Sequence, residues 1–259
     1  MPPVEDGAFA VWLARQAGDL LLNLRDEIGF DDPAGLRHAG DKRSHDLIMT
    51  ELARWRPADA VLSEEGVDDP VRLTANRLWI IDPLDGTREF GEPGRADWAV
   101  HVALWRRTGE GEGELAAGAV GLPAQQRVLG SEPPPAYPPL SAEAAAGGGI
   151  RIATSRTRPP AFLAAVAEQV GATLVPMGSA GAKIAAVVTG DVDAYIHAGG
   201  QYEWDSAAPV AVAAAAGLHT SRVDGAPLRY NQSDASLPDL LVCRRDLAAD
   251  LLSVLSQHR

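Results

Sequence analysis

The first 55 residues carry hydrophobic positions at helical spacing. Between residues 9 and 28, apolar side chains recur every three or four positions, which predicts one long helix that ends at Gly29. A second helix is expected to begin at Asp41, whose carboxylate would accept backbone N–H groups as an N-cap. The predicted buried positions are Leu13, Ala17, Leu20, Leu21, Leu24 and Ile28 in the first helix, and Leu47, Ile48, Leu52 and Trp55 in the second.

Strand patterns follow these two helices. Residues 60–62 form a short apolar run, and residues 78–81 form an unbroken one, typical of a strand buried on both faces. Residues 99–105 indicate another strand, and residues 116–129 indicate two short strands. Helices followed by a run of strands are an α+β pattern, which we expect for the N-terminal half.

A proline-rich and glycine-rich connector separates this half from the rest. It spans residues 131–149 and predicts a boundary between a domain of residues 1–140 and a domain of residues 141–259. Strands and helices alternate beyond the connector, which is typical of an α/β domain. The expected strands are 150–155, 173–175 and 192–197, and the expected helices are 161–170 and 180–188.

An alanine-rich helix is expected after Asp205. Its apolar run covers residues 210–216, with Pro209 in the first turn, where a missing N–H costs little. Asp205 would then lie at the helix N-terminus, a position that suits a capping carboxylate and also favours a bound anion. A strand at 240–243 and a helix at 246–256 complete the predicted elements.

Composition and charge narrow the possible partners. The chain has 259 residues, 46% of them hydrophobic, so it is long and apolar enough for a large core. A formal net charge of −12 argues against a nucleic-acid polymer as partner, because phosphate backbones are held by clustered Lys and Arg. A single cysteine, the absence of a long apolar span and the lack of a signal-like N-terminus predict a cytoplasmic protein with no membrane partner.

An acidic segment follows the strand that is predicted to be buried on both faces. Pro83 is expected to turn the chain there and to bring the carboxylates of Asp82 and Asp85 together. With the Leu84 carbonyl and the Thr87 hydroxyl, they form an oxygen-rich cluster suited to Mg²⁺. An ordinary acidic turn is the alternative interpretation, since Asp and Gly are common turn residues.

Other polar positions are ambiguous when each is taken alone. Glu64 and Glu65 follow the strand at 60–62 and would fit a solvated loop, while Asp41 and Asp205 would fit helix caps. The six histidines show no metal-ligand spacing, so none is predicted to bind a metal.

Together, these segments resemble the inositol monophosphatase superfamily of Mg²⁺-dependent, lithium-sensitive phosphatases. The matching segments are Ser-Glu-Glu at 63–65, Trp-Ile-Ile-Asp-Pro-Leu-Asp-Gly-Thr at 79–87 and Trp-Asp-Ser-Ala-Ala-Pro at 204–209, in the family's order. Thr-Arg-Glu-Phe at 87–90 is similar to the 3'(2'),5'-bisphosphate nucleotidase branch, as are the segments 154–156 and 180–184.

The resemblance implies a layered αβαβα sandwich with the active site between its two halves. It implies two Mg²⁺ ions, or three with a weaker site near Glu64 and Glu65. The implied ligands are Glu64, Asp82 and the Leu84 carbonyl for the first ion, and Asp82, Asp85 and Asp205 for the second.

The resemblance also implies roles in catalysis and in substrate binding. Asp41 and Thr87 would orient and deprotonate the attacking water. The implied substrate contacts are Glu64, Leu84, Asp85, Gly86, Thr87, Ser155, Arg156, Gly178, Ser179, Lys183 and Asp205.

Several functions remain open at this point. The favoured one is hydrolysis of the 3'-phosphate of adenosine 3',5'-bisphosphate, or of its 5'-phosphosulfate, to serve sulfur metabolism. Inositol monophosphatase or fructose-1,6-bisphosphatase activity would use the same metal chemistry, and a non-catalytic phosphate-binding regulator would use none. A phosphoaspartyl enzyme also carries Asp-Gly-Thr, but its acids stand two residues apart, whereas Asp82 and Asp85 are three apart. The expected partners are a small nucleotide bisphosphate and, by analogy, a second copy of the chain in a homodimer.

Overall fold

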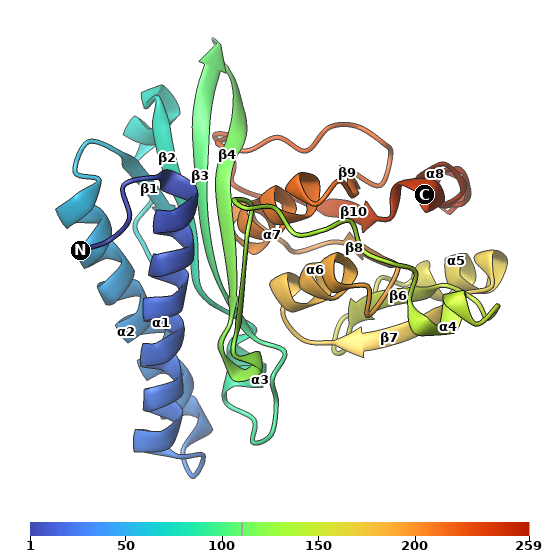
Figure 1. Ribbon diagram of the computed structural model, residues 1–259, viewed down its shortest axis with the longest axis horizontal. Coiled ribbons are helices and arrows are strands. Elements are labelled where there is room, and N and C mark those ends of the chain that lie inside the picture. Colours follow the sequence, from blue (N-terminus) through green and yellow to red (C-terminus); the bar gives the residue numbers. More distant parts are fainter. Residues whose placement is uncertain (110, 259) are drawn as a thin grey trace.

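Helices and sheets alternate in five layers (Figure 1). The computed structural model describes residues 1–109 and 111–258. Helices α1 and α2 cover one face of the first sheet, α6 and α7 lie between the two sheets, and α5 and α8 cover the far face of the second. The predicted αβαβα sandwich is therefore confirmed. The helices are α1 (Asp6–Ile28), α2 (Pro33–Trp55), α3 (Thr87–Phe90), α4 (Ala142–Ala145), α5 (Leu163–Val170), α6 (Ala180–Thr189), α7 (Glu203–Ala215) and α8 (Ala248–Leu255).

Helix α2 begins eight residues earlier than the sequence pattern suggested. Asp32 is its N-cap and accepts the N–H of Gly35 at 3.0 Å, and Pro33 occupies the first helical position, which suits its fixed φ. Asp41 therefore lies inside the helix, and the prediction that it caps α2 was wrong. Gly40 also lies inside the helix. Its lack of a side chain allows α2 to pack closely on Phe90, because a Cβ there would lie 2.7 Å from the ring.

The first sheet has the strand order β1-β2-β3-β4-β5. Strand β1 pairs with β2 in parallel, and the remaining pairs are antiparallel. The region 116–129 holds the end of a long strand and one short strand, rather than the two short strands expected. The bounds are β1 (Ala60–Ser63), β2 (Arg77–Asp85), β3 (Ala99–Gly109), β4 (Glu112–Leu122) and β5 (Arg127–Gly130).

Strand β2 continues past Pro83, which corrects the predicted turn at that residue. Pairing with β1 stops at Ile81, and the register with β3 shifts between Asp82 and Asp85. Pro83 therefore lies where no ladder N–H is needed, and its carbonyl accepts the hydroxyl hydrogen of Ser44 at 2.7 Å. The irregular strand end, rather than a turn, brings the two carboxylates to the cleft.

The second sheet has the strand order β7-β6-β8-β10-β9. Strand β6 pairs in parallel with β7 and β8, and β10 runs antiparallel to its neighbours. Helix α7 starts at Glu203, so Pro209 lies inside it and not in its first turn as predicted, while Asp205 does lie in that first turn. The bounds are β6 (Arg151–Ser155), β7 (Thr173–Met177), β8 (Ala194–Ala198), β9 (His219–Ser221) and β10 (Asp239–Cys243).

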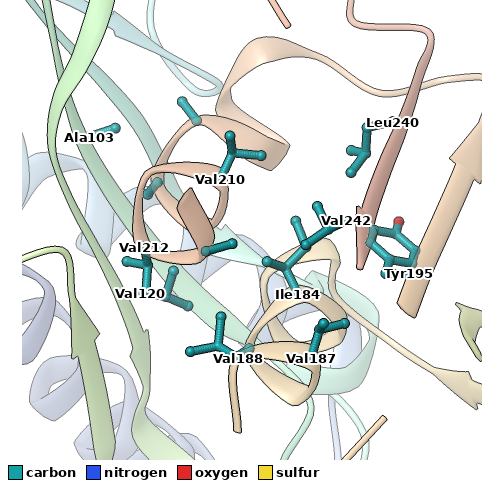
Figure 2. Close-up of a cluster of buried hydrophobic side chains, with 14 of the residues drawn as sticks. Ala103, Val120, Ile184, Val187, Val188, Tyr195, Val210, Val212, Leu240 and Val242 are labelled. Carbon is teal, nitrogen blue, oxygen red and sulfur yellow. The ribbon is translucent and has the colours of Figure 1, made fainter. Parts of the chain in front are cut away.

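A shared core joins the two halves of the chain. Figure 2 shows Val210 and Val212 of α7, with Ile184 of α6, between the first sheet and strand β10 of the second. The connector does separate the two sheets along the chain, but helices of the second half fill the space against both. Within the described residues, no helix has the length and apolar character of a membrane span.

Candidate active site

A cavity of about 290 Å³ opens where the end of β2 meets α6, α7 and the second sheet. Its wall contains every proposed metal ligand and substrate contact. Asp41 lies outside the wall but contacts the wall residue Thr87, and Glu65, near the expected third metal, is not part of the wall. The structure thus brings together residues from both halves of the chain. The predicted residues in the wall are Glu64, Asp82, Leu84, Asp85, Gly86, Thr87, Ser155, Arg156, Gly178, Ser179, Lys183 and Asp205.

Three carboxylates converge in this cavity. Asp82 and Asp85 of β2 and Asp205 of α7 each present an oxygen within 4.8 Å of the others. Burial raises the pKa of Asp82 well above its ordinary value, and the charges of Glu64 and Asp85 add to the effect. The pKa of Asp205 is raised to about 7 by burial and then by the charge of Asp85. Carboxylates that repel one another in a buried site are suited to binding a hard divalent cation.

Glu64 brings a fourth carboxylate to the same wall. It follows β1 directly, and its N–H donates to the carbonyl of Ile81 at 3.2 Å, which places it beside β2. The pKa of Glu64 is raised to about 7, first by desolvation and then by the charges of Asp85 and Asp41. The parallel pairing of β1 with β2 therefore places acids from two separate segments at one edge of the sheet.

Asp85 is held by the start of α6. Its Oδ2 accepts the hydroxyl hydrogen of Ser179 at 2.5 Å and the N–H of Gly181 at 2.7 Å. Two hydrogen bonds from the other half of the chain fix this carboxylate, so Ser179 contributes to the site through Asp85.

Thr87 and Asp41 form a hydrogen-bonded pair beside the acidic cluster. The Thr87 hydroxyl lies 3.3 Å from Asp41 Oδ1 and 3.0 Å from the carbonyl oxygen of Leu84, so its single hydrogen serves one acceptor at a time. Burial and then the charge of Glu65 raise the pKa of Asp41 to about 6. A carboxylate with a pKa near neutrality is suited to accept a proton through the hydroxyl.

Two predicted substrate-binding cations have partners within the protein. The Arg156 guanidinium donates to Glu89 at 2.7 Å and to Glu92 at 2.9 Å. The buried ammonium of Lys183 donates to the carbonyls of Gly178 and Ser179, at 3.1 Å and 2.7 Å. Both side chains therefore stabilise the cavity wall through contacts within the protein.

The sequence analysis did not predict several histidine and aromatic residues that lie at the site. The ring of His101, fully buried in β3, lies against Asp85, and His197 lines the cavity beside Tyr195 and Gln201. A polar residue within the apolar run of residues 99–105 was the available signal for His101, because a buried imidazole needs a partner.

Comparison with known proteins identifies the family of the chain. The sequence profile of the inositol monophosphatase family matches residues 8–258. A 3'-phosphoadenosine 5'-phosphate phosphatase of Mycobacterium leprae is 54% identical over 260 residues, which cover 97% of this chain and 94% of that protein. The 3'(2'),5'-bisphosphate nucleotidase CysQ of Escherichia coli is 30% identical over 243 residues, which cover 87% of this chain and 94% of that protein.

A solved structure shares the fold. Inositol monophosphatase II from Staphylococcus aureus superposes with a TM-score of 0.74 at 22% identity, over 96% of this chain and 95% of that one. The profile match spans nearly the whole chain, and the relatives above align over most of their own lengths. The chain belongs to the inositol monophosphatase family.

Proposed function

We propose that this protein removes the 3'-phosphate from adenosine 3',5'-bisphosphate to give AMP and phosphate, in a reaction that requires Mg²⁺. The names of the Mycobacterium leprae and Escherichia coli relatives support this substrate. The single observation that carries the chemistry is the convergence of Asp82, Asp85 and Asp205 within 4.8 Å.

The donor set fits Mg²⁺. Glu64, Asp82 and the Leu84 carbonyl would hold one ion, and Asp82 with Asp85 and Asp205 would hold a second. All five groups line one cavity, and all are the oxygen donors that Mg²⁺ prefers. When bound, Mg²⁺ would neutralise the phosphate and acidify a nearby water.

The protein's own groups would position the water and the phosphate. The water would attack phosphorus in line with the departing 3'-oxygen, while its proton passes to the Thr87 hydroxyl oxygen and the threonine hydrogen passes to Asp41. The bond from phosphorus to the 3'-oxygen breaks, and that oxygen takes up a proton from solvent. The N–H groups of Gly86 and Thr87 and the N-terminus of α7 would donate to the phosphate oxygens.

A phosphate-release assay tests this function. We expect the highest kcat/KM for adenosine 3',5'-bisphosphate, lower values for inositol 1-phosphate and fructose 1,6-bisphosphate, and no release after the metal is removed with EDTA. Asp82→Asn should abolish release, whereas Asp19→Asn, a matched change of an exposed acid in α1, should not. A clear preference for inositol phosphate or fructose bisphosphate would overturn the proposed substrate. Full activity of Asp82→Asn would overturn the proposed site.

The remaining expectations are proposals of the same kind. We place the domain boundary at 140/141, so that the first domain carries Glu64, Asp82 and Asp85 and the second carries Asp205. A homodimer and a third metal near Glu64 and Glu65 are further proposals. Light scattering of the purified protein tests the homodimer, and metal titration by calorimetry counts the ions.

A further inference from the structure

The cavity wall holds both acidic and cationic side chains. Beside the acidic cluster around Asp82, the wall contains four cationic side chains, in a chain whose net charge is −12. A phosphate beside the acids needs added metal ions, but a phosphate beside the cations does not. The four cations in the wall are Arg88, Arg156, Arg158 and Lys183.

Two of these four cations are already neutralised or fixed by the protein. Arg156 is shared by Glu89 and Glu92, and the ammonium of Lys183 donates to two carbonyls and lies 5.2 Å above the Tyr195 ring. Arg156 would have to give up a carboxylate to bind a ligand, and two of the three ammonium hydrogens of Lys183 already serve carbonyl oxygens. They are therefore poorly suited to supply new charge for a second phosphate.

Arg88 and Arg158 differ from the other two. Both side chains are exposed at the cavity, and neither guanidinium makes a hydrogen bond or an ion pair within residues 1–109 and 111–258. Arg88 belongs to α3, directly after the proposed catalytic Thr87. Arg158 follows β6, in a turn that is closed by a 3.1 Å bond from its N–H to Ser155 Oγ. The backbone of both arginines is thus fixed while their charges are uncompensated.

We propose that Arg88 and Arg158 form the subsite for the phosphate that is not cleaved. The inference rests on the proposed function, because a bisphosphate leaves one phosphate away from the acidic cluster. That group carries up to two negative charges at neutral pH, and the planar guanidinium binds phosphate oxygens in pairs. A monophosphate offers these arginines no second anion, so the pair sets the preference for bisphosphates.

Kinetics on two nucleotides isolate this role. The ratio of kcat/KM for adenosine 3',5'-bisphosphate to that for adenosine 3'-monophosphate should be high in the wild type. It should fall about tenfold in Arg88→Gln or Arg158→Gln, and further in the double variant, which is the scale of one charge-assisted hydrogen bond. Arg15→Gln, an exposed arginine of α1 outside the cavity, is the matched control and should leave the ratio unchanged.

Binding of the product provides a second measurement that does not depend on turnover. AMP retains the 5'-phosphate and adenosine lacks it, so calorimetry should show that the wild type binds AMP more tightly. In the double variant the two affinities should become similar. An unchanged AMP preference, or equal losses on both substrates in the kinetic test, would overturn the subsite.

The two proposals fail in different ways. A wild-type protein that hydrolyses neither adenosine nucleotide would refute the proposed substrate, and the comparison of AMP with adenosine would still decide the role of the arginines. A wild-type protein that cleaves the bisphosphate with a ratio insensitive to both arginines would refute the subsite alone.

Discussion

His101 Nε2 lies 3.3 Å from Asp85 Oδ2, and both groups are buried between the two halves of the chain. The other ring nitrogen, Nδ1, lies 3.0 Å from the carbonyl oxygen of Trp204. A carbonyl only accepts, so Nδ1 carries the hydrogen and the ring is fixed as one tautomer. Burial lowers the pKa of His101, which keeps the ring neutral. In this tautomer Nε2 carries no hydrogen for Asp85, so His101 hydrogen-bonds the residue preceding Asp205 and only packs against the β2 carboxylate.

Two replacements of His101 should distinguish the contribution of its hydrogen bond from that of its side-chain volume. His101→Leu removes the ring's hydrogen bond to the Trp204 carbonyl, which costs about 0.5–1.5 kcal/mol, and should let Asp205 shift relative to Asp85. His101→Asn keeps an N–H near the position of Nδ1. We expect Mg²⁺ affinity, measured by calorimetry, to fall clearly in the leucine variant and less in the asparagine variant. Equal affinities in both variants would contradict a positioning role.

Asp205→Asn should have opposite effects on the metal-free and the metal-bound protein. Without metal, Asp205 is repelled by Asp85 and Glu64, so removing its charge should raise the unfolding free energy at pH 8 by on the order of 1–2 kcal/mol. The amide oxygen can still accept the N–H of Tyr202, as the carboxylate does at 2.7 Å. With Mg²⁺ added, the rise in Tm that we expect for the wild type should largely disappear in the variant, because a ligand is lost.

Thermal melts with and without Mg²⁺ measure both effects. Asp19→Asn is again the control, since it removes one exposed charge far from the carboxylate cluster. A variant that is less stable without metal would show that Asp205 is a structural cap whose charge the fold requires.

Gly40→Ala should damage the site although alanine favours a helix. The added Cβ would lie 2.7 Å from Phe90 Cε1 and 2.8 Å from Leu84 Cδ2, so α2 must move away from α3. The gain of about 1 kcal/mol in helix propensity is offset by overpacking of about 1–3 kcal/mol. The shift should also lengthen the bond between Thr87 and Asp41 and lower kcat.

The neighbouring Ala39→Gly is the matched control for this change. It should lose stability through helix propensity alone and keep its kcat. Measurement of Tm and kcat on both variants separates the two causes. A Gly40→Ala protein with higher Tm and unchanged kcat would contradict the close packing of α2 on α3.

The sequence predicted those parts of the site that depend on local patterns. An apolar run that ends in Asp82 and Asp85 identifies a buried strand and its acidic end without any long-range information. The start of α2 was missed because Gly40 and Asp41 have the residue types of a helix boundary. The reason for Gly40 is a contact with Phe90, which is distant along the chain and has no trace in the local pattern.

Charge pairing was the other feature that the sequence did not show. Arg156 was predicted to bind substrate, but its guanidinium meets Glu89, which lies 67 positions earlier. Only the arrangement of β6 against α3 shows that Arg156 is paired, while Arg88 and Arg158 have no side-chain partner among residues 1–109 and 111–258. Pairing across the two halves is a tertiary property, so the sequence cannot distinguish one arginine from the next.

His197 should make the protein less stable in mild acid. It is 8% exposed in β8, and burial, followed by the nearby charges of Lys183 and Arg158, lowers its pKa to about 4 from an ordinary 6.5. Between these values the unfolded chain binds the proton and the folded chain does not, so stability is complete above pH 6.5 and is lost as the pH falls toward 4. The contribution lost from this residue between pH 7 and pH 5 is roughly 2 kcal/mol.

Urea unfolding of the metal-free protein at pH 7 and pH 5 tests this contribution. The quantity compared is the loss of unfolding free energy between the two pH values in the wild type and in His197→Gln. Raised carboxylate pKa values act in the opposite direction, but they are common to the wild type and to His197→Gln and therefore cancel in the comparison. On going to pH 5, the wild type should lose roughly 2 kcal/mol more than His197→Gln does. His38→Gln, which changes an exposed histidine of α2, should behave as the wild type. If the wild type and His197→Gln lose the same amount, the imidazole is already protonated in the folded state, and its burial in the cavity wall does not control its charge.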